Sequence, residues 1–254
     1  MALLEKQIIM LAGLSGLVSM RNGLLCIILA SFFFAGCTAP TYRGHPQMHE
    51  KLAKAKTIMI LSPDVEVYYV SAGGVTEKVN EWSYAARSNV TVALEEALRK
   101  RGGVVVPAPD IPAQEKEEIQ ALFEAVSASI ELHTYGRSGH LFQEKLSAFD
   151  YTMGQGFKQW SGQVDALLLV KAFDNVSSGG RKALLIGAIV LAARLGIFPV
   201  SPGGESFVSM ALIDPGSGEI IWFDAGGSAG TYDLRKSGST RRLINQILAD
   251  FPLP

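Results

Sequence analysis

Histidines are the side chains best suited to bind metals or move protons near neutral pH. In this sequence they stand at positions 45, 49, 133 and 140. Glu50 follows His49, but no further histidine comes at the spacing that zinc proteases require. His45 and His49 lie in a polar stretch, where solvated histidines are the ordinary interpretation and adventitious chelation is the alternative. We therefore predict no resident metal and no cofactor.

The best candidates for acid–base catalysis are three aspartates, Asp165, Asp174 and Asp214. Two of them stand at the ends of an expected strand. The third stands in a glycine-rich turn, where an aspartate ordinarily hydrogen-bonds the backbone of its own turn. The glycines at 154 and 156 lack the third glycine of a dinucleotide fingerprint, and residues 136–140 lack the spacing of a nucleophile elbow. Because no catalytic cluster is found, we predict that the protein is not an enzyme.

Four aromatic residues could form a partner surface, namely Tyr68, Tyr69, Trp82 and Tyr84. On a sheet packed with helices, about half of such residues must face the core. Burial is therefore the ordinary interpretation, and a partner surface is the alternative.

Residues 20–37, MRNGLLCIILASFFFAGC, have the three parts of a secretory signal. Arg21 supplies the positive charge, residues 24–34 the apolar segment, and small residues precede Cys37. A cleaved signal is favoured over an uncleaved membrane helix, because residues 24–36 span about 20 Å as a helix and a hydrocarbon core is about 30 Å thick. A second apolar run precedes Arg21, so we expect translation to start at Met20, within a signal region that covers residues 1–36.

The end of this segment, Phe34-Ala35-Gly36-Cys37, resembles the lipobox of bacterial lipoproteins, with Phe34 where leucine is usual. The resemblance implies cleavage between Gly36 and Cys37, lipidation of the cysteine with palmitate-type chains, and acylation of its new amino group. Thr38 is not the aspartate that tends to hold lipoproteins in the inner membrane, which implies an outer-membrane location facing the periplasm. The other cysteine, Cys26, lies within the signal, so the mature chain has no thiol besides its anchor.

The mature chain is predicted to be a tether followed by one domain. Residues 38–51 are polar and contain two prolines and a glycine, which is typical of a tether after Cys37. In residues 52–254, apolar runs predict strands and a period of 3.6 predicts helices. Strands are expected at 56–63, 65–71, 103–109 and 165–174 and in a hairpin over 206–227, and helices at 80–101, 113–132 and 238–252. The last helix is expected to be capped by Ser239 or Thr240 and ended by Pro252. This order predicts an α/β domain, in which residues 135–160 have no clear element.

The element order and the hairpin resemble one class of bacterial envelope lipoproteins. TIMILSP near the start, VDALLLVKAFDNVSSGG, and ALIDPGSGEIIWF before the last helix are similar to the CsgG, LpoB and PelC class over about residues 55–252. The resemblance implies a mixed β-sheet packed with amphipathic helices, an anticodon-binding-domain-like α/β sandwich also found in the N-terminal domain of TolB. It implies scaffold, regulatory or secretion roles without catalysis, and it provides no active-site residues.

The apolar segment ALLIGAIVLAARLGIFPV, residues 183–200, needs a separate explanation. Its uncharged part, 183–193, spans about 16 Å as a helix, and continuing it through Arg194 costs about 2.5–3.5 kcal/mol at the centre of a bilayer. We therefore expect a hydrophobic helical insertion at about 182–200. Packing on the domain is the ordinary interpretation, contact with the lipid surface or a partner is the second, and a spanning helix is the least favoured. The candidate contact residues are Ile186, Val190, Leu191, Ile197 and Phe198.

The overall charge excludes one class of partner. With a formal net charge of -1, the chain lacks the basic surface of nucleic-acid binding proteins. The favoured function is a non-enzymatic assembly, scaffold or regulatory component of an envelope complex serving secretion, polysaccharide export or peptidoglycan synthesis. It would contact the membrane through its N-terminal lipid and bind an envelope protein or a second copy of itself. The alternatives are an oligomeric, membrane-inserting secretion component and a tethered periplasmic enzyme.

Overall fold

The computed structural model describes residues 42–136, 141–194 and 204–251. In helix α6 (Gly179–Arg194), side chains are described as far as residue 189. The chain divides into two compact units, Met1–Pro40 and Thr41–Pro254, and all described residues belong to the second.

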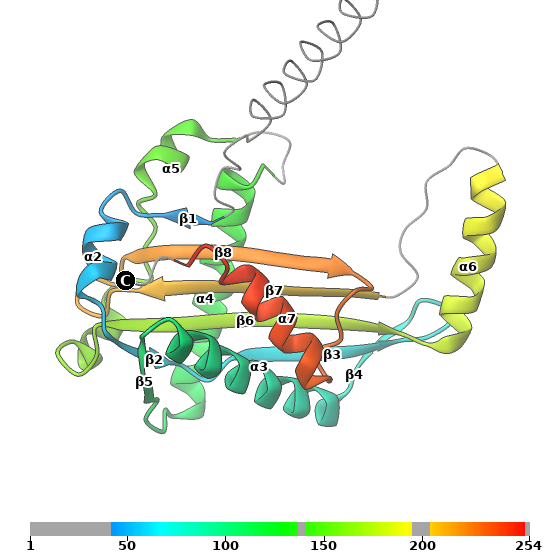
Figure 1. The fold of residues 1–254 in the computed structure, drawn as a ribbon, viewed down its shortest axis with the longest axis horizontal. Helices are drawn as coiled ribbons and strands as arrows, with labels where there is room; N and C mark the ends of the chain where they lie inside the picture. Colours follow the sequence, from blue (N-terminus) through cyan, green and yellow to red (C-terminus); the bar gives the residue numbers. More distant parts are fainter. Residues whose placement is uncertain (1–41, 137–140, 195–203, 252–254) are drawn as a thin grey trace, which may run out of the picture. The chain divides into compact units, whose positions relative to one another are not determined.

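The described residues form a mixed sheet of eight strands (Figure 1). The strand order is β1-β8-β7-β6-β2-β5, with β3 beside β6 and β4 beside β3. The strands are β1 (Arg43–Gly44), β2 (Thr57–Ile60), β3 (Asp64–Val70), β4 (Thr76–Lys78), β5 (Val104–Pro107), β6 (Ala166–Ser177), β7 (Gly204–Ile213) and β8 (Ile220–Ala229). Pairing is parallel among β2, β5, β6 and β3, and antiparallel where β7, β8, β1 and β4 join. The sheet and its helices confirm the predicted α/β class.

The long strand β6 is the centre of this sheet. One edge of β6 pairs with β7, from Leu167 opposite Ile213 to Val176 opposite Gly204. The other edge pairs first with β2 and then, from Lys171 onward, with β3. Pro63 lies between β2 and β3, and because proline has no N–H it cannot continue a ladder. One apolar run of the sequence therefore forms two successive partners of the same strand.

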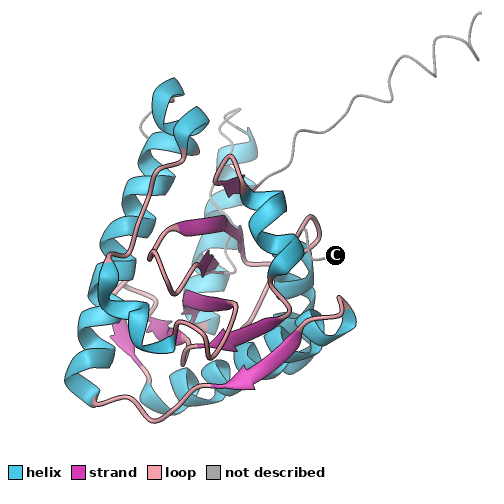
Figure 2. Ribbon diagram, turned by 90° about the vertical axis from the view of Figure 1, so that its left-hand side faces the viewer, coloured by secondary structure: helices cyan, strands magenta, loops and turns pink. Residues whose placement is uncertain are grey.

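Helices cover both faces of the sheet (Figure 2). The helices are α2 (Met48–Lys54), α3 (Asn80–Lys100), α4 (Ala113–Thr134), α5 (Gln143–Ala148), a 3-10 helix (Gln155–Trp160), α6 (Gly179–Arg194) and α7 (Ser237–Ile247). One hydrophobic cluster joins α2, α3 and α7 to the sheet, and a second joins α4 and residues 149–164 to it. Along β6, Leu168 and Val170 belong to the first cluster and Leu167 and Leu169 to the second, as the two-residue period of a strand requires. The domain therefore has three layers, with the sheet between two layers of helices and one hydrophobic cluster on each face of the sheet.

The structure differs from the sequence prediction over residues 38–51. Of these, residues 42–51 belong to the domain, because β1 pairs with β8 and α2 buries Met48 and Leu52. Two strand residues and a short helix contain too few apolar positions to produce a visible period. The domain therefore begins about ten residues earlier than the predicted boundary at 52.

The first turn of α7 also differs from the prediction. The helix begins at Ser237 after Lys236, so Ser239 and Thr240 lie inside the first turn rather than at the N-cap. Thr240 Oγ1 donates to Leu234 C=O at 2.9 Å, and Ser239 Oγ accepts from Asp233 N–H at 2.9 Å. Their hydroxyls thus tie the helix to the preceding loop. The helix ends at Ile247, and Pro252 lies outside the described residues.

Candidate functional site

Helix α6 follows directly from the end of β6, beyond the last paired residues of the sheet. Figure 1 shows it at one end of the sheet, apart from the other helices. Ser178 begins it, since Ser178 Oγ accepts a hydrogen bond from the Arg181 N–H at 3.1 Å, the pattern of an N-cap serine. The local sequence therefore starts a helix at a point where no sheet surface lies beneath it.

The described side chains of α6 are not part of either core. From Gly179 to Ile189 none is buried, although the helix carries no acidic residue and only two basic ones in this stretch. Leu184 is 63% exposed and Ile186 is 53% exposed. A helix that is apolar on all sides is normally buried in a protein or a membrane. Packing on the domain, the ordinary interpretation of the sequence, is therefore wrong for Leu184 and Ile186, whereas Leu185 is partly covered.

A hollow lies at the base of α6, with a volume of about 390 Å³. Leu185 and Arg181 of the helix line it on one side, and Val70, Asn175 and Gly204 of the strands on the other. Gly204 has a φ of +98°, and a Cβ there would lie 1.8 Å from the Asn175 carbonyl oxygen. No other residue fits this position without moving the backbone of β6. The strands β6 and β7 are thus close-packed where the connection begins and ends, whereas α6 is separated from them by the hollow.

Of the five predicted contact residues, only Ile186 has a side chain that the structure describes. Ile186 lies on the exposed surface of α6. Val190 and Leu191 belong to α6, but their side chains lie outside the described residues, as do Ile197 and Phe198 entirely. Gly36 and Cys37, the predicted cleavage and lipidation residues, also lie outside the described part of the chain.

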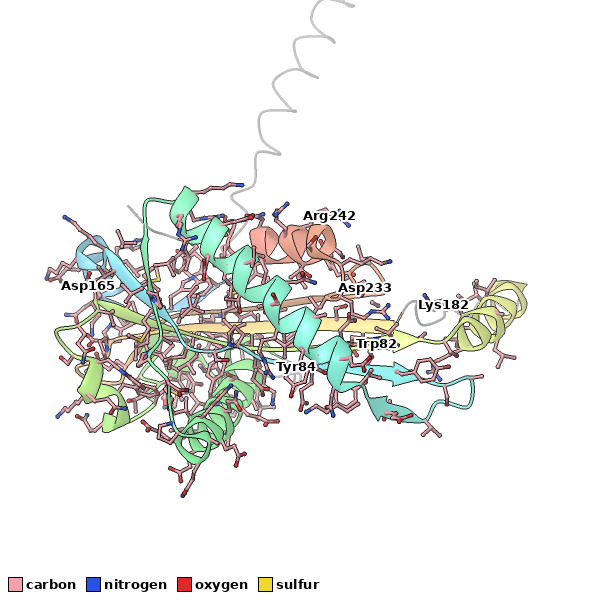
Figure 3. The ribbon with its side chains drawn as sticks, turned by 90° about the horizontal axis from the view of Figure 1, so that it is seen from below. Trp82, Tyr84, Asp165, Lys182, Asp233 and Arg242 are labelled. Atoms are coloured by element: carbon pink, nitrogen blue, oxygen red, sulfur yellow. The ribbon has the colours of Figure 1, made fainter. Side chains whose placement is uncertain are left out.

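Asp174 lies at the opposite end of β6 from Asp165, whereas Asp214 follows β7 at the same end as Asp165. Asp165 and Asp174 stand nine residues apart along β6, which corresponds to about 30 Å, and Figure 3 shows Asp165 at the opposite end from Asp233 and Lys182. Asp165 accepts hydrogen bonds from Thr57 Oγ1 (2.7 Å) and Thr57 N–H (2.8 Å), and these bonds hold the pKa of its carboxyl below the usual range. It therefore joins the starts of β2 and β6.

The other two aspartates also have structural partners. Asp174 is 2% exposed and accepts from Ser206 Oγ and the Leu234 N–H, each at 2.8 Å. Burial raises the pKa of Asp174 above its usual value. Asp214 Oδ1 accepts from the Gly216 N–H at 2.8 Å, which confirms the prediction that it bonds its own turn.

The described histidines have local partners rather than a shared metal site. His45 Nδ1 accepts from the Gln47 N–H at 3.1 Å, and the ring of His133 packs edge-on against Phe142. His49 is exposed, and His140 lies outside the described residues. Among the residues that the structure describes, no group of three histidine, aspartate or glutamate side chains is placed to hold a metal ion.

The four aromatic candidates are only partly exposed. Tyr84 is 66% exposed and Tyr69 37% exposed, whereas Tyr68 and Trp82 are half-buried. The rings of Tyr69 and Trp82 pack edge to face, with centroids 6.3 Å apart. Arg235 lies over Trp82, with its guanidinium carbon 4.4 Å from the ring centre. Trp82 thus supports Arg235, which belongs to a basic region that the sequence analysis did not detect.

Pairs of adjacent basic residues mark this region in the sequence. Dibasic pairs stand at 181–182, 235–236 and 241–242, and Lys182, Arg235, Lys236 and Arg242 all line one hollow at the start of α7. Pairs of basic residues are common on solvated surfaces, and only the fold shows that these pairs meet.

Within the described residues, no helix has both the length and the apolar character that crossing a membrane requires.

Comparisons with known proteins were made for the sequence and for the fold. No family model matches the chain, and no curated protein matches it. Among solved structures, it is similar to the PelC dodecamer from Paraburkholderia phytofirmans, with 13% identity over 83% of this chain and 97% of that chain and a TM-score of 0.34. It is also similar to lipoprotein GNA1162 from Neisseria meningitidis, with 12% identity over 77% and 96% of the two chains and a TM-score of 0.31. For the LpoB C-terminal domain from Salmonella enterica, the identity is 12%, the shares are 73% and 95%, and the TM-score is 0.24. Likenesses this weak establish no shared function.

Proposed function

We propose that this chain is a lipid-anchored, non-enzymatic component of a cell-envelope assembly and that α6 is the element through which it binds its partner. The observation that carries this proposal is the exposed apolar surface of α6, where Leu184 and Ile186 face solvent. Burying a large aliphatic side chain contributes about 1.5–3 kcal/mol, so a partner that covers both residues gains several kcal/mol. The partner is a protein surface with an apolar groove, on another envelope protein or on a second copy.

The N-terminal sequence supplies the anchor in this proposal. In it, residues 1–36 are the signal region and Cys37 carries the lipid. Because Thr38 is not the aspartate that tends to hold lipoproteins in the inner membrane, the protein reaches the outer membrane with its domain facing the periplasm. Two or more acyl chains provide stable anchoring where a single chain is marginal. A protein held at a surface in this way meets its partners at high local concentration.

The absence of an enzymatic role is supported by the roles of the aspartates. Asp165, Asp174 and Asp214 each accept backbone hydrogen bonds that hold the fold together. A catalytic pair needs two such groups within reach of one substrate atom. Asp174 lies at the far end of β6 from the other two, and Asp165 and Asp214, which stand at the same end, each accept backbone hydrogen bonds of their own.

The test of docking is site-specific photocrosslinking in cells. A photoreactive residue at position 186 is expected to give a defined crosslinked product, with either a second copy or another envelope protein. The same residue at position 122 is the control, because Leu122, like Ile186, is an exposed aliphatic side chain, 44% accessible, but lies on α4. Equal products from both positions, or crosslinks from position 186 to lipid alone, would contradict the docking role.

The test of anchoring uses the two cysteines. Cys37→Ser is expected to abolish metabolic labelling with palmitate and to release the domain from the outer-membrane fraction. Cys26→Ser is the matched control, since we place Cys26 in the removed signal, and it should keep both properties. Continued palmitate labelling of Cys37→Ser would refute the anchor.

A further inference from the structure

Four cationic side chains from three segments line one hollow beside α6. We call it the cationic hollow and define it by Lys182 of α6, Arg235 and Lys236 of the loop before α7, and Arg242 of α7. Its volume is about 230 Å³. Figure 3 shows Lys182, Asp233 and Arg242 at the same end of the sheet. Cations that repel one another in water are here brought together by the fold.

Only part of this positive charge is neutralised by protein groups. Asp233 holds Arg235 through two hydrogen bonds of 2.9 Å, to Nε and Nη2, and lies 3.4 Å from Lys236 Nζ. Asp174, the other carboxylate at the hollow, is already bonded to Ser206 and the Leu234 N–H. Within the described part of the chain, Lys182 and Arg242 form no ion pair. The hollow therefore retains an excess of positive charge.

The start of α7 adds to this excess. Lys236, Ser239 and Arg242 stand three residues apart, so they share the face of α7 that lines the hollow. No side chain caps the first turn, and the turn contains no acidic residue. The N-terminal end of a helix carries a partial positive charge and unpaired N–H groups. The partial positive charge at the start of α7 and the four cationic side chains thus all favour an anion in the hollow.

One of the four cations is held in place before any ligand binds. The guanidinium of Arg235 is fixed by its two bonds to Asp233 and by its position over Trp82. A fixed guanidinium loses less conformational entropy on binding than a free one. An ordinary solvated basic surface has no such support, and this distinguishes the hollow from scattered surface charge.

We propose that the cationic hollow binds a phosphate group, carried either by an envelope lipid headgroup or by a soluble phosphate compound. A phosphate matches these residues because the Arg242 guanidinium can bind two of its oxygens, the lysines neutralise its charge, and helix N-termini favour it. Arg235, whose Nε and Nη2 are already bonded to Asp233, adds positive charge at a fixed position. The proposal does not rest on the docking role of α6, although Lys182 places the site at the base of that helix. Ile186 stands four residues after Lys182, on the same face of α6, so a headgroup bound there would lie on the side of the helix that exposes this isoleucine.

The test measures binding to the detergent-solubilised full chain by calorimetry. The probes are inorganic phosphate, glycerol 3-phosphate, and short-chain phosphatidylglycerol, with short-chain phosphatidylcholine as the zwitterionic comparison. The variant is Lys182→Gln with Arg242→Gln. Its matched control is Lys100→Gln with Arg241→Gln, which removes the same charge from exposed residues outside the hollow; Arg241 is paired with Glu96. Equal urea midpoints for the two double variants establish that both are folded.

We expect the hollow variant to bind phosphate-bearing probes at least about tenfold more weakly than the unmodified protein, and the control variant to stay within about twofold. Affinity should also fall with added salt. Binding of the soluble phosphates supports a soluble ligand, whereas binding of phosphatidylglycerol alone supports a headgroup. Equal weakening in both double variants, or no binding of any phosphate probe, would overturn the proposal.

Discussion

Helices α6 and α7 both connect to the central strands, but they use apolar residues in opposite ways. In α7, the apolar residues Leu243, Ile244 and Ile247 lie on one face and are all buried, while the opposite face is polar. In α6, apolar residues occur on every side, and no described side chain is buried. The helix with fewer apolar residues is therefore the one that belongs to the core.

The difference shows that position relative to the sheet decides burial. α7 lies across β6, β7 and β8, and its apolar face meets theirs in the first hydrophobic cluster. α6 begins after β6 has ended, so it has no sheet face to cover. The apolar residues of both segments are compatible with a helix, but only α7 lies where its apolar face can pack against the domain.

The sharpest test of this comparison makes the same substitution in both helices, beginning with the larger effect. Leu243→Ala removes a side chain that is 1% exposed and should lower the free energy of unfolding by about 2–5 kcal/mol. Urea unfolding followed by circular dichroism measures it. A loss below about 1 kcal/mol would mean that α7 is not anchored in the core as described.

The second test concerns the buried carboxyl that holds the loop before α7. Asp174→Asn leaves one donor without its acceptor and should cost about 1–3 kcal/mol at acidic pH. Because burial raises the folded-state pKa of Asp174, its contribution is fully present below the unfolded-state pKa and declines as pH rises through the folded-state value. The stability advantage of the natural protein over the variant should therefore shrink as the pH rises above about 4, the unfolded-state value. An advantage that grows over this range would show that hydrogen bonding to the carboxylate outweighs its burial.

A third, smaller effect is expected at the first turn of α7. Thr240→Val removes the hydroxyl that donates to the Leu234 and Lys236 carbonyls but keeps the side-chain shape. Both carbonyls keep another donor, since Asn89 Nδ2 reaches Leu234 O and the Ser239 N–H reaches Lys236 O. The loss should therefore be about 1 kcal/mol. Thermal unfolding compared with Thr240→Ser, which keeps the hydroxyl, separates the hydrogen bonds from the packing.

The smallest effect is expected in α6. Leu184→Ala removes as many atoms as Leu243→Ala, but from a side chain that is 63% exposed. It should change the free energy of unfolding by less than about 0.5 kcal/mol. If Leu184→Ala lowered the free energy of unfolding as much as Leu243→Ala, then α6 would be packed in the core like α7, and the difference described between the two helices would be wrong.

The strong periodic patterns of the sequence predicted most of the fold. The helix predicted over 80–101 is α3, where apolar residues that recur at helical spacing, such as Ala86, Val90 and Leu94, are buried. Strand β6 and the β7–β8 hairpin stand where the apolar runs indicated. These elements are long enough for their period to exceed chance. β1 and β4 have two and three residues, which is too short for a period, and they gain stability from pairing rather than from their own sequence.

Residues 149–164 show another limit of prediction from sequence. Phe149, Phe157 and Trp160 are buried in the second cluster without forming a regular apolar pattern. Phe149 has a φ of +39°, a conformation that propensities do not predict for a bulky residue.

The candidate sites depended still more on tertiary structure. The sequence correctly assigned Asp214 to its turn, because that bond is local. The cationic hollow joins Lys182 to Arg235 and Arg242, more than fifty residues away, so no local pattern could combine them. The exposure of Ile186 depends on where β6 ends, which its own neighbours in the chain do not specify.

The pairing of Val176 with Gly204 has a consequence for how the chain can be altered. These two residues are opposite each other on β6 and β7, so the whole connection that contains α6 leaves and re-enters the sheet at neighbouring points, about 5 Å apart. The entropy of closing such a connection changes only slowly with its length. The connection is therefore a replaceable module: a short glycine-containing turn in its place should leave the sheet intact, and a different segment could be grafted there to give the same domain a different partner.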